Sequence, residues 1–563
     1  MTIRNEFFET IFVNMCLLKK NPRKLTKSII VIRDGNLEVG KKLCEGNYIF
    51  GGVELDPSID NPWLVEVPSK EVEISMHGFS WLNDLRNLGT SKARNLALEW
   101  INLWEEAYSK GKKYSWDPEI TALRVQNLAC NWNFVSGKSD KPFTQYLISL
   151  DRQYYYLRLI SGVIKPGYIK IKILYAILCL SIVYDETNRL KSKIASNLYK
   201  VINSHFDKNI SVASRNPEEL CDCFFIINEI LKRDKDKEIT LSKNNKIKLK
   251  ELEKKVIPIL RGLRLGNGYL TRSHGGDNGS IELIDKHLTR SEVHLKPSQE
   301  NLMGFERLMA GRLILIVDCG KAKKNFQRFK YHGSALAFEL SSGQRPIFVN
   351  CGPGSRFGTD FKKYCRATHA HNACTLEHLS QLEYRVIARN RRWPEDLTFG
   401  GPRKVTIERH KTLEATWLNL SQDTFEEVYG YRHYRKLLFL NTGKVFRGTD
   451  CFEISKSKIA DKQRTKNFYA FFQLHPDVEL WDHPRLKTIV LRLKNGEHWI
   501  FEVDLGEVNV EDSIFINSQK SYPERAKRIV IKSPELYSKT EIKWSLRRRE
   551  IVSRNTRDNM LVE

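Results

Sequence analysis

At 563 residues the chain is too long for one hydrophobic core, so its length predicts two or three domains. Its formal net charge of +25 favours polyanionic partners, namely nucleic acid, acidic polysaccharide or anionic lipid. A lysine-rich solvated surface without any partner explains the same charge equally well. The 11 cysteines contain no CxxC pair, which favours free thiols over a secreted disulfide framework or a zinc knuckle.

The N-terminal stretch does not resemble an export signal. Its apolar patch "FFETIFVNMCLL" is interrupted by Glu9 and Asn14 and has no small-residue cleavage site, so the chain starts like a cytoplasmic protein. The longest apolar run, residues 173–184, has about twelve residues, whereas a membrane span needs about 20. We therefore expect a buried helix there and no transmembrane segment.

The first half of the chain has helical periodicity. The segment 90–110 puts apolar side chains on one stripe, at Ala93, Leu96, Ala97, Trp100, Ile101, Trp104 and Ala107. Asp117 and Pro118 are typical of the start of a further helix. More helices are expected over 142–162, 168–186, 188–205 and 217–233, so the chain is predicted to be helical up to about residue 263.

The second half changes to short apolar runs that end at glycine, asparagine or aspartate. Two hairpin turns are expected, at Asn441-Thr442-Gly443 and at Asn495-Gly496. Many strands at roughly ten-residue spacing without intervening helices predict an antiparallel β-sandwich. The basic clusters at 236–255 and near the C-terminus lack interleaved aromatic residues, so nucleic acid is not the favoured partner.

Seven segments in chain order resemble the bacterial heparinase II/III family over about 85% of the chain. They are "HGFSWLNDLRNLGT", "SWDPEITALRVQN", "SRNPEEL", "YHGSALAFELSSGQRPIFVNCG", "RATHAHNACTL", "GYRHYRKLLFLNTG" and "FFQLHPDVELW". The resemblance implies an α+β multidomain fold, in which an N-terminal (α/α) toroid precedes a C-terminal antiparallel β-sandwich. The expected boundaries are an N-terminal extension over 1–70, the toroid over 71–265, a linker with the first strands over 266–300, and the sandwich over 301–563.

The same resemblance implies an activity and a site. Characterised relatives cleave uronic-acid polysaccharides by β-elimination, which requires groups that neutralise the carboxylate and groups that move a proton. His332 matches a position that serves as an acid/base or carboxylate-binding group, and His371, the second expected catalytic residue, matches the histidine of a His-Asn pair that would neutralise the uronate carboxylate. Positions that would bind the acidic polysaccharide are matched by Asn372, Arg215, Asn216 and Arg366.

The chain departs from the family pattern at other positions. The zinc-binding members have a second histidine and an aspartate where this sequence has Ser334 and Asn350, so His371 is the one strong ligand and no metal or other cofactor is expected. The toroid Asn-His pair and the tyrosine beyond "SRNP" have no counterpart. A tyrosine from residues 154–156 could replace the missing phenol.

Structural interpretations exist for the candidate residues as well. His332 lies at the predicted head of a strand whose face becomes apolar within two residues, which also suits a structural histidine at a sheet edge. Arg215 and Asn216 fit a helix start that is capped by Asn216, with Pro217 in the first turn. Asn372 could hydrogen-bond backbone groups at a sheet corner.

Two functions follow from these observations. The first is β-elimination of a heparin-, heparan-sulfate- or alginate-like polysaccharide in the cleft between toroid and sandwich. The second is a non-catalytic role, either in binding acidic glycans or in cell-envelope polysaccharide biogenesis. The resemblance implies the cell envelope or periplasm, whereas the N-terminus favours the cytoplasm, and the oligomeric state is left open.

Overall fold

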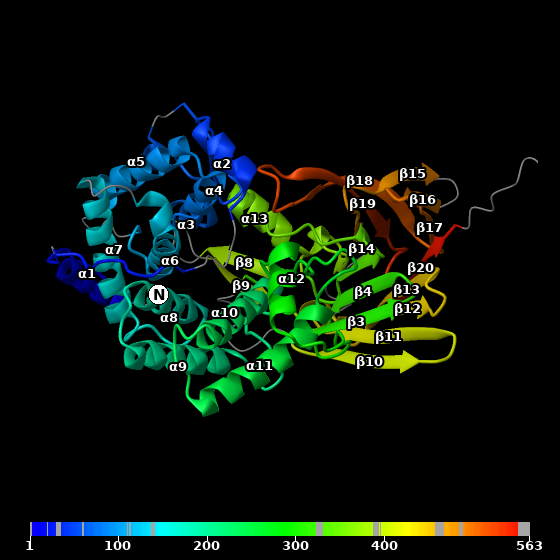
Figure 1. The fold of residues 1–563 in the computed structure, drawn as a ribbon. Coiled ribbons are helices and arrows are strands. Elements are labelled where there is room, and N and C mark those ends of the chain that lie inside the picture. The colour runs from blue at the N-terminus through cyan, green and yellow to red at the C-terminus, as the bar shows by residue number, and fades with distance from the viewer. Residues whose placement is uncertain are drawn as a thin grey trace, which may run out of the picture.

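The computed structural model describes most of the chain. The described residues are 3–19, 21–29, 35–58, 61–109, 111, 114–136, 141–321, 330–386, 393, 396–456, 467–483 and 488–549. Figure 1 shows a curved array of helices, coloured blue to green, beside stacked sheets that are coloured green to red. The predicted order of a helical domain followed by an antiparallel β-sandwich is confirmed.

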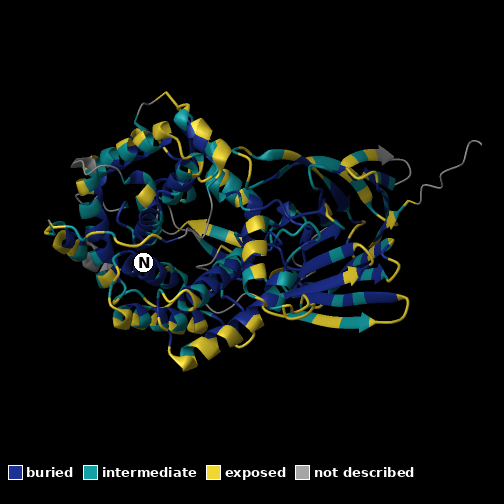
Figure 2. Ribbon diagram, viewed as in Figure 1, coloured by how far each residue is buried: buried dark blue, intermediate teal, exposed yellow. Residues whose placement is uncertain are grey.

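The helices of the first domain form a layered arc around a large apolar core. Each amphipathic helix turns its apolar stripe toward its neighbours, whereas exposed residues gather on outward faces such as that of α11 (Figure 2). The helices are α1 (Ile3–Leu17), α2 (Leu37–Cys44), α3 (Lys70–His77), α4 (Trp81–Leu88), α5 (Ser91–Tyr108), α6 (Pro118–Val135), α7 (Lys141–Ile160), α8 (Tyr168–Val183), α9 (Asn188–His205), α10 (Pro217–Lys235), α11 (Lys243–Gly262) and α12 (Ile281–Arg290).

Helix starts agree with the expected capping residues. The Asp117 side chain accepts a hydrogen bond from the N–H of Glu119, with Pro118 in the first turn of α6. Asn216 caps α10 in the same way, and Pro217 follows it. Helix α8 is apolar on nearly all sides because it is enclosed by other helices, which explains the long apolar run. No helix within the described ranges combines the length and the apolarity that crossing a bilayer requires.

The second domain is built from antiparallel sheets that enclose a second apolar core. An eight-stranded sheet has the order β10-β11-β12-β13-β20-β17-β16-β15, and two four-stranded sheets have the orders β3-β4-β5-β6 and β18-β19-β14-β7. The predicted turns at Asn441-Thr442-Gly443 and Asn495-Gly496 join β12 to β13 and β16 to β17.

The strands of the sandwich have the following bounds. They are β3 (Phe305–Ala310), β4 (Leu313–Asp318), β5 (Phe338–Ser342), β6 (Arg345–Phe348), β7 (Cys374–Leu376), β8 (Leu382–Val386), β9 (Asp396–Gly400), β10 (Val405–Lys411), β11 (Ala415–Gln422), β12 (Tyr431–Leu440), β13 (Val445–Ile454), β14 (Phe468–Gln473), β15 (Glu479–His483), β16 (Thr488–Arg492), β17 (His498–Val503), β18 (Glu507–Phe515), β19 (Glu524–Lys532) and β20 (Lys539–Arg548). Strands β8 and β9 form a separate hairpin, and the short helix α13 (Thr359–Arg366) precedes β7.

Two predicted boundaries differ from the structure. The segment 266–300 carries helix α12, which packs on α10, and the first sandwich strand starts only at Phe305. Within the predicted extension 1–70, helix α1 packs against α7, and the β1 (Tyr48–Phe50) and β2 (Val53–Leu55) hairpin lies against the helices. Buried apolar residues such as Phe50 and Trp63 join the first half's core, so this segment is part of the helical domain.

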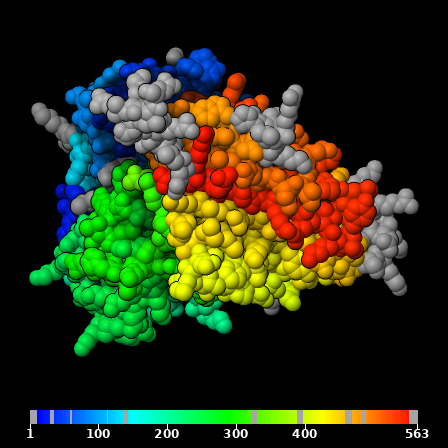
Figure 3. All heavy atoms as spheres, turned by 90° about the vertical axis from the view of Figure 1, so that its right-hand side faces the viewer, coloured from blue at the N-terminus to red at the C-terminus, as the bar shows by residue number. Residues whose placement is uncertain are grey.

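The two domains abut directly. Figure 3 shows the green end of the helical domain in contact with the yellow strands of the sandwich. The phenol of Tyr331 donates a hydrogen bond to the carbonyl of Ala213, and Lys330 pairs with Glu71 of α3. We use the word seam for this boundary, at which Glu71, Ala213 and Arg215 of the helical domain and the segment around His274 meet Asp318 and residues 330–372 of the sandwich.

Candidate functional site

Three histidines gather at the seam. The rings of His332 and His371 lie 5.2 Å apart, and the ring of His274 lies 6.4 Å from that of His332. His332 is 5% exposed and His371 is fully buried. Within the described part of the chain, no hydrogen bond reaches Nδ1 of His332, and the buried His371 ring interacts with the backbone of Cys365. Native proteins rarely leave such atoms unpaired, so the cluster needs a functional or solvent explanation.

His332 does not head a strand, contrary to the expectation from the sequence. Residues 331–337 have no strand pairing, and β5 starts only at Phe338. The N–H of Gly333 donates to the carbonyl of Arg366, and the N–H of Leu336 donates to the carbonyl of Asp318. Leu336 also has a positive φ of 61°. These bonds turn the chain away from the sheet, and they leave His332 facing His371.

His274 is a member of the cluster that sequence reasoning missed. Its Nδ1 accepts a hydrogen bond from the backbone N–H of His332 at 3.3 Å, so the neutral ring carries its proton on Nε2. That atom lies 3.2 Å from Oδ2 of Asp318, which the hydroxyl of Ser334 also reaches at 2.8 Å. The available signal was the glycine-flanked "RSHGG" segment at the domain boundary.

Arg215 ties the helical domain to the sandwich. Its guanidinium forms a buried ion pair with Asp318 and donates to the carbonyls of Met303 (3.0 Å), Gly320 (3.0 Å) and Gly304 (3.1 Å). A Cβ on Gly320 would lie only 2.2 Å from the Arg215 Cζ, so the glycine is needed for this approach. The carboxylate that Arg215 binds in this structure is therefore Asp318 of the chain itself.

The other predicted substrate-binding residues also bind groups of the chain. The Asn372 amide donates to the carbonyls of Phe338 and Val349 and accepts from the N–H of Gln473. Arg366 donates to the carbonyl of Tyr331 and the hydroxyl of Thr398. Asn216 caps α10 and is partly exposed. A direct contact of Arg215, Arg366 or Asn372 with a ligand would require these bonds to break, so substrate binding by them stays a prediction.

Tyrosines 154–156 do not supply the missing phenol. Tyr154 and Tyr155 face the segment that follows α1, and the Tyr156 hydroxyl donates to the carbonyl of Trp116. Tyr331 lies nearest to the histidines, with its ring 4.8 Å from that of His274, but its hydroxyl is bonded to Ala213. Nearby at the seam, partly exposed Lys172 pairs with Glu119.

Burial lowers the pKa of all three clustered histidines. The pKa of His371 falls to about 3, first because of burial and then because of His274, and that of His332 falls well below its usual value through burial and His371. His274 shifts in the same direction through burial, against the attraction of Asp318. All three rings are therefore neutral at pH 7, each with a lone pair that can accept a proton.

This burial predicts acid sensitivity. The unfolded chain takes up protons on these histidines below pH 6.5 and the folded chain does not, so the free energy of unfolding should fall as the pH drops from 6.5 toward 4. Each ring contributes up to about 1.4 kcal/mol per pH unit. Urea titrations of the wild type and of H371N test this, because the variant should show a shallower slope. Equal slopes in both proteins would contradict it.

Ser334 and Asn350, which the family resemblance aligns with zinc ligands, do not fit a metal here. The hydroxyl of Ser334 donates to Asp318, and Nδ2 of Asn350 donates to the carbonyl of Arg272, which leaves His371 as the one strong ligand among these matched positions. A structural zinc site needs four nitrogen, sulfur or carboxylate ligands. No step of the chemistry below uses a metal.

A second group with metal-like spacing lies in the sandwich core. Its members are Cys374, His433 and Asp450. The guanidinium of Arg435 fills the position of a cation, because it binds Asp450 at 2.6 and 3.1 Å and the sulfur of Cys374 at 3.2 Å. Incubation with a chelator is therefore expected to leave the melting temperature unchanged. A fall of several degrees that added zinc reverses would contradict this assignment.

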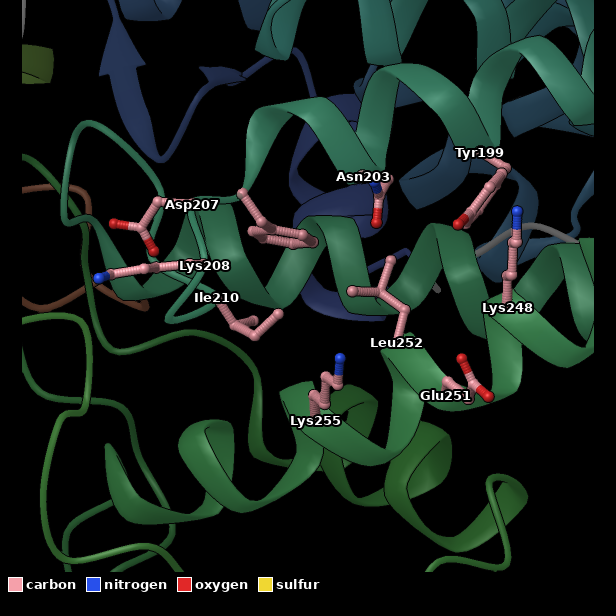
Figure 4. A pocket seen from close by; sticks show the side chains of 10 residues that line it. Tyr199, Asn203, Asp207, Lys208, Ile210, Lys248, Glu251, Leu252 and Lys255 are labelled. Carbon is pink, nitrogen blue, oxygen red and sulfur yellow. The ribbon is translucent and has the colours of Figure 1, made fainter.

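The two cavities described in the structure lie away from the histidines. The larger, of about 540 Å³, opens on the helical domain between α9, the following loop and α11. Figure 4 shows Lys208, Lys248 and Lys255 around it together with Asp207 and Glu251. The mixed charges are typical of a solvated surface hollow. The smaller cavity, beside α1 and α7, is considered below.

Comparison with known proteins agrees with this architecture. Residues 297–545 match the family described as heparinase II/III-like, C-terminal. The chain carries a heparinase II/III-like C-terminal domain. A curated relative, "FtsZ-localized protein C" of Caulobacter vibrioides, is 24% identical over 531 residues, which cover 91% of this chain and 88% of the relative.

Solved lyase structures share the whole fold. The crystal structure of heparinase III matches with a TM-score of 0.71 at 10% identity, and covers 96% of this chain and 89% of that one. Heparan sulfate lyase HepC from Pedobacter heparinus matches with a TM-score of 0.54 at 13% identity, over 97% of this chain and 88% of that one. At these identities the likeness shows the fold, so the heparinase II/III-like domain here is joined to the same kind of helical toroid.

Proposed function

We propose that this heparinase II/III-like protein cleaves a uronic-acid polysaccharide by β-elimination, with His332 and His371 as its acid/base pair. The observation that carries the proposal is the pair of neutral, adjacent imidazoles, in which Nδ1 of His332 bonds to no described group. Elimination at C5 of a uronate needs a neutral base, because a protonated imidazole has no lone pair to offer.

The charges around His332 suit an acidic sugar. Arg366 and Lys330 both act electrostatically on its ring and lower its pKa further, after burial, His371 and His274. A substrate carboxylate bound beside His332 would experience the same two positive charges, which would make the neighbouring C5 proton more acidic. In this proposal His332 takes the C5 proton and becomes an imidazolium. His371 accepts a proton from it on one ring nitrogen and gives the proton on its other ring nitrogen to the leaving glycosidic oxygen, so that both rings end neutral.

Substrate access requires movement at the seam. His332 is 5% exposed and His371 is fully buried, so a polysaccharide reaches them only when the toroid and the sandwich separate locally. The pairs that close the seam include Lys330–Glu71, whose side chains are 55% and 31% exposed. Glu71 is partly buried, and against that burial Lys330 lowers its pKa to about 2, so breaking this pair is part of the cost of opening the seam.

A panel of heparin, heparan sulfate, alginate and hyaluronan tests the proposal. Elimination creates an unsaturated uronate that absorbs in the ultraviolet, so wild-type protein should produce a rising absorbance with at least one of the four. The absence of any such product from a folded protein, across the panel and across pH 5 to 9, would remove the elimination proposal.

A second candidate is a non-catalytic protein that retains the lyase fold. Two observations favour it: the guanidinium of Arg215 and the amide of Asn372 are fully engaged within the chain, and the curated relative is named for its localisation with FtsZ. By this analogy the chain would localise with FtsZ. Glycan binding without product, together with a fluorescent fusion that follows FtsZ, would support this candidate.

A further inference from the structure

A small cavity beside α1 and α7 has a composition that the seam chemistry does not use. Its volume is about 380 Å³, and its lining residues are Lys19, Arg23, Tyr154, Tyr155, Arg158 and Leu159. The first two follow the end of α1, and the others lie on α7. We call it the α1–α7 cavity. It lies on the helical domain, apart from the histidine cluster.

The tyrosine in this cavity has a hydroxyl without a partner. Tyr154 is fully buried, and no described group forms a hydrogen bond with its Oη. Burial raises the pKa of Tyr154 to about 12, so the phenol keeps its proton and remains a donor. A buried donor without an acceptor is costly, and a bound acceptor would remove that cost.

The remaining polar groups of the lining are cations that aromatic rings help to hold. The Arg23 guanidinium lies 4.8 Å from the ring of Tyr154 and 4.0 Å from that of Tyr184. The Arg158 guanidinium lies 5.7 Å from the ring of Tyr154. Lys19 lies 4.5 Å from the ring of Tyr155. Stacking of this kind holds a cation without neutralising it.

The carboxylates nearby do not balance these cations. Asp151 pairs with Arg23 at 2.7 Å and with Lys19 at 3.6 Å, and Glu186 pairs with Arg23 at 2.6 Å. Among the described residues, no carboxylate lies within ion-pair distance of Arg158. Three cations thus face two carboxylates, and the side chains that reach the cavity offer donors and almost no acceptors.

We propose that the α1–α7 cavity binds the oxyanion group of a small acidic ligand, either a carboxylate of an acidic sugar or a phosphate. Arg158 and Lys19 supply the charge, and the Tyr154 hydroxyl donates a hydrogen bond to one of the anionic oxygens. The volume leaves room for the rest of a ligand about the size of one sugar. This site is independent of the elimination proposed at the seam.

Isothermal titration calorimetry tests the proposal by measuring the heat of binding when D-glucuronate, inorganic phosphate or D-glucose is added to the full chain. The wild type should bind at least one of the two anions and should not bind glucose. Binding of glucuronate alone would identify an acidic sugar as the ligand class, and binding of phosphate alone would identify a phosphorylated one. Failure of both anions to bind would overturn the proposal.

Two variants and one control sharpen the test. Y154F removes only the unpartnered hydroxyl, so its affinity should fall about tenfold or more while its melting temperature does not drop. R158A removes an exposed cation and should also lose affinity, whereas R189A removes an exposed arginine of α9 and should bind like the wild type. Wild-type affinity in both Y154F and R158A would contradict the assignment.

Discussion

Replacing Asp318 by asparagine is expected to lower the free energy of unfolding by about 3 to 5 kcal/mol, because it leaves the buried guanidinium of Arg215 without a counter-charge. Asp318 is 4% exposed, and its pKa is held far below the usual range against burial by Arg215 and then by His274. The same carboxylate accepts from the hydroxyl of Ser334 and from the N–H of Gly320. Urea unfolding of D318N at pH 7.5 measures the effect.

A matched control is the exposed pair of Lys41 and Glu38, one turn apart on α2. E38Q removes a carboxylate from an ion pair just as D318N does, but solvent screens this pair, so a loss below about 1 kcal/mol is expected. G320A is a second variant that disturbs the ion pair of Arg215 and Asp318, since the added Cβ would collide with the Arg215 guanidinium. If D318N were no less stable than E38Q, the ion pair of Arg215 and Asp318 would not join the two domains as described.

Replacing His332 by alanine is expected to lower the elimination rate by about 100-fold to 10,000-fold while the protein stays folded. The rate falls because the group that takes the proton is lost. The fold survives because the missing ring nitrogen Nδ1 makes no hydrogen bond to a described residue. Initial rates on the best substrate of the panel, together with melting temperatures, measure both effects.

H410A is the control for this prediction, because His410 is a half-exposed histidine of β10 whose described contacts are with Trp417, Glu408 and Asn419 and not with the clustered histidines. It should retain wild-type activity. H371A should reduce activity about as much as H332A does. H274Q should reduce activity less, because His274 accepts a hydrogen bond from the backbone N–H of His332 and has no proposed contact with the substrate. Equal rates in H332A and H410A would show that the cluster is structural.

Most of the fold could be predicted from local signals. Helical periodicity and caps such as Asp117 and Asn216 depend on neighbouring residues, and the structure confirms both. The strand turns at Gly443 and Gly496 were predictable for the same reason, since their positive φ values of 68° and 82° favour glycine. The helix in 266–300 was missed because glycine and charged residues around it read as a loop.

The site was predictable only in part. His332 and His371 were expected to be close together, because the family resemblance assigned both to one reaction, and their rings are adjacent. His274 and Asp318 come from segments with no matching motif, and only tertiary packing brings them to His332. Arg215 was expected to be free for a ligand carboxylate, because sequence cannot show that an internal aspartate lies within its reach.

The resemblance carries less information on activity than on architecture. A lyase fold at 10% identity to heparinase III is compatible with elimination and with its loss. The neutral pair at His332 and His371 favours elimination, and the engaged side chains of Arg215, Arg366 and Asn372 favour its loss. The two functions therefore differ in one observable, which is the formation of an unsaturated product.

Product formation by wild-type protein and H332A, side by side on the same polysaccharide panel, tests the central claim most directly. Our account predicts an ultraviolet-absorbing unsaturated product with the wild type on at least one substrate, and a loss of at least 100-fold in rate with H332A. No product with folded wild-type protein on any substrate, or equal product with H332A, would contradict it.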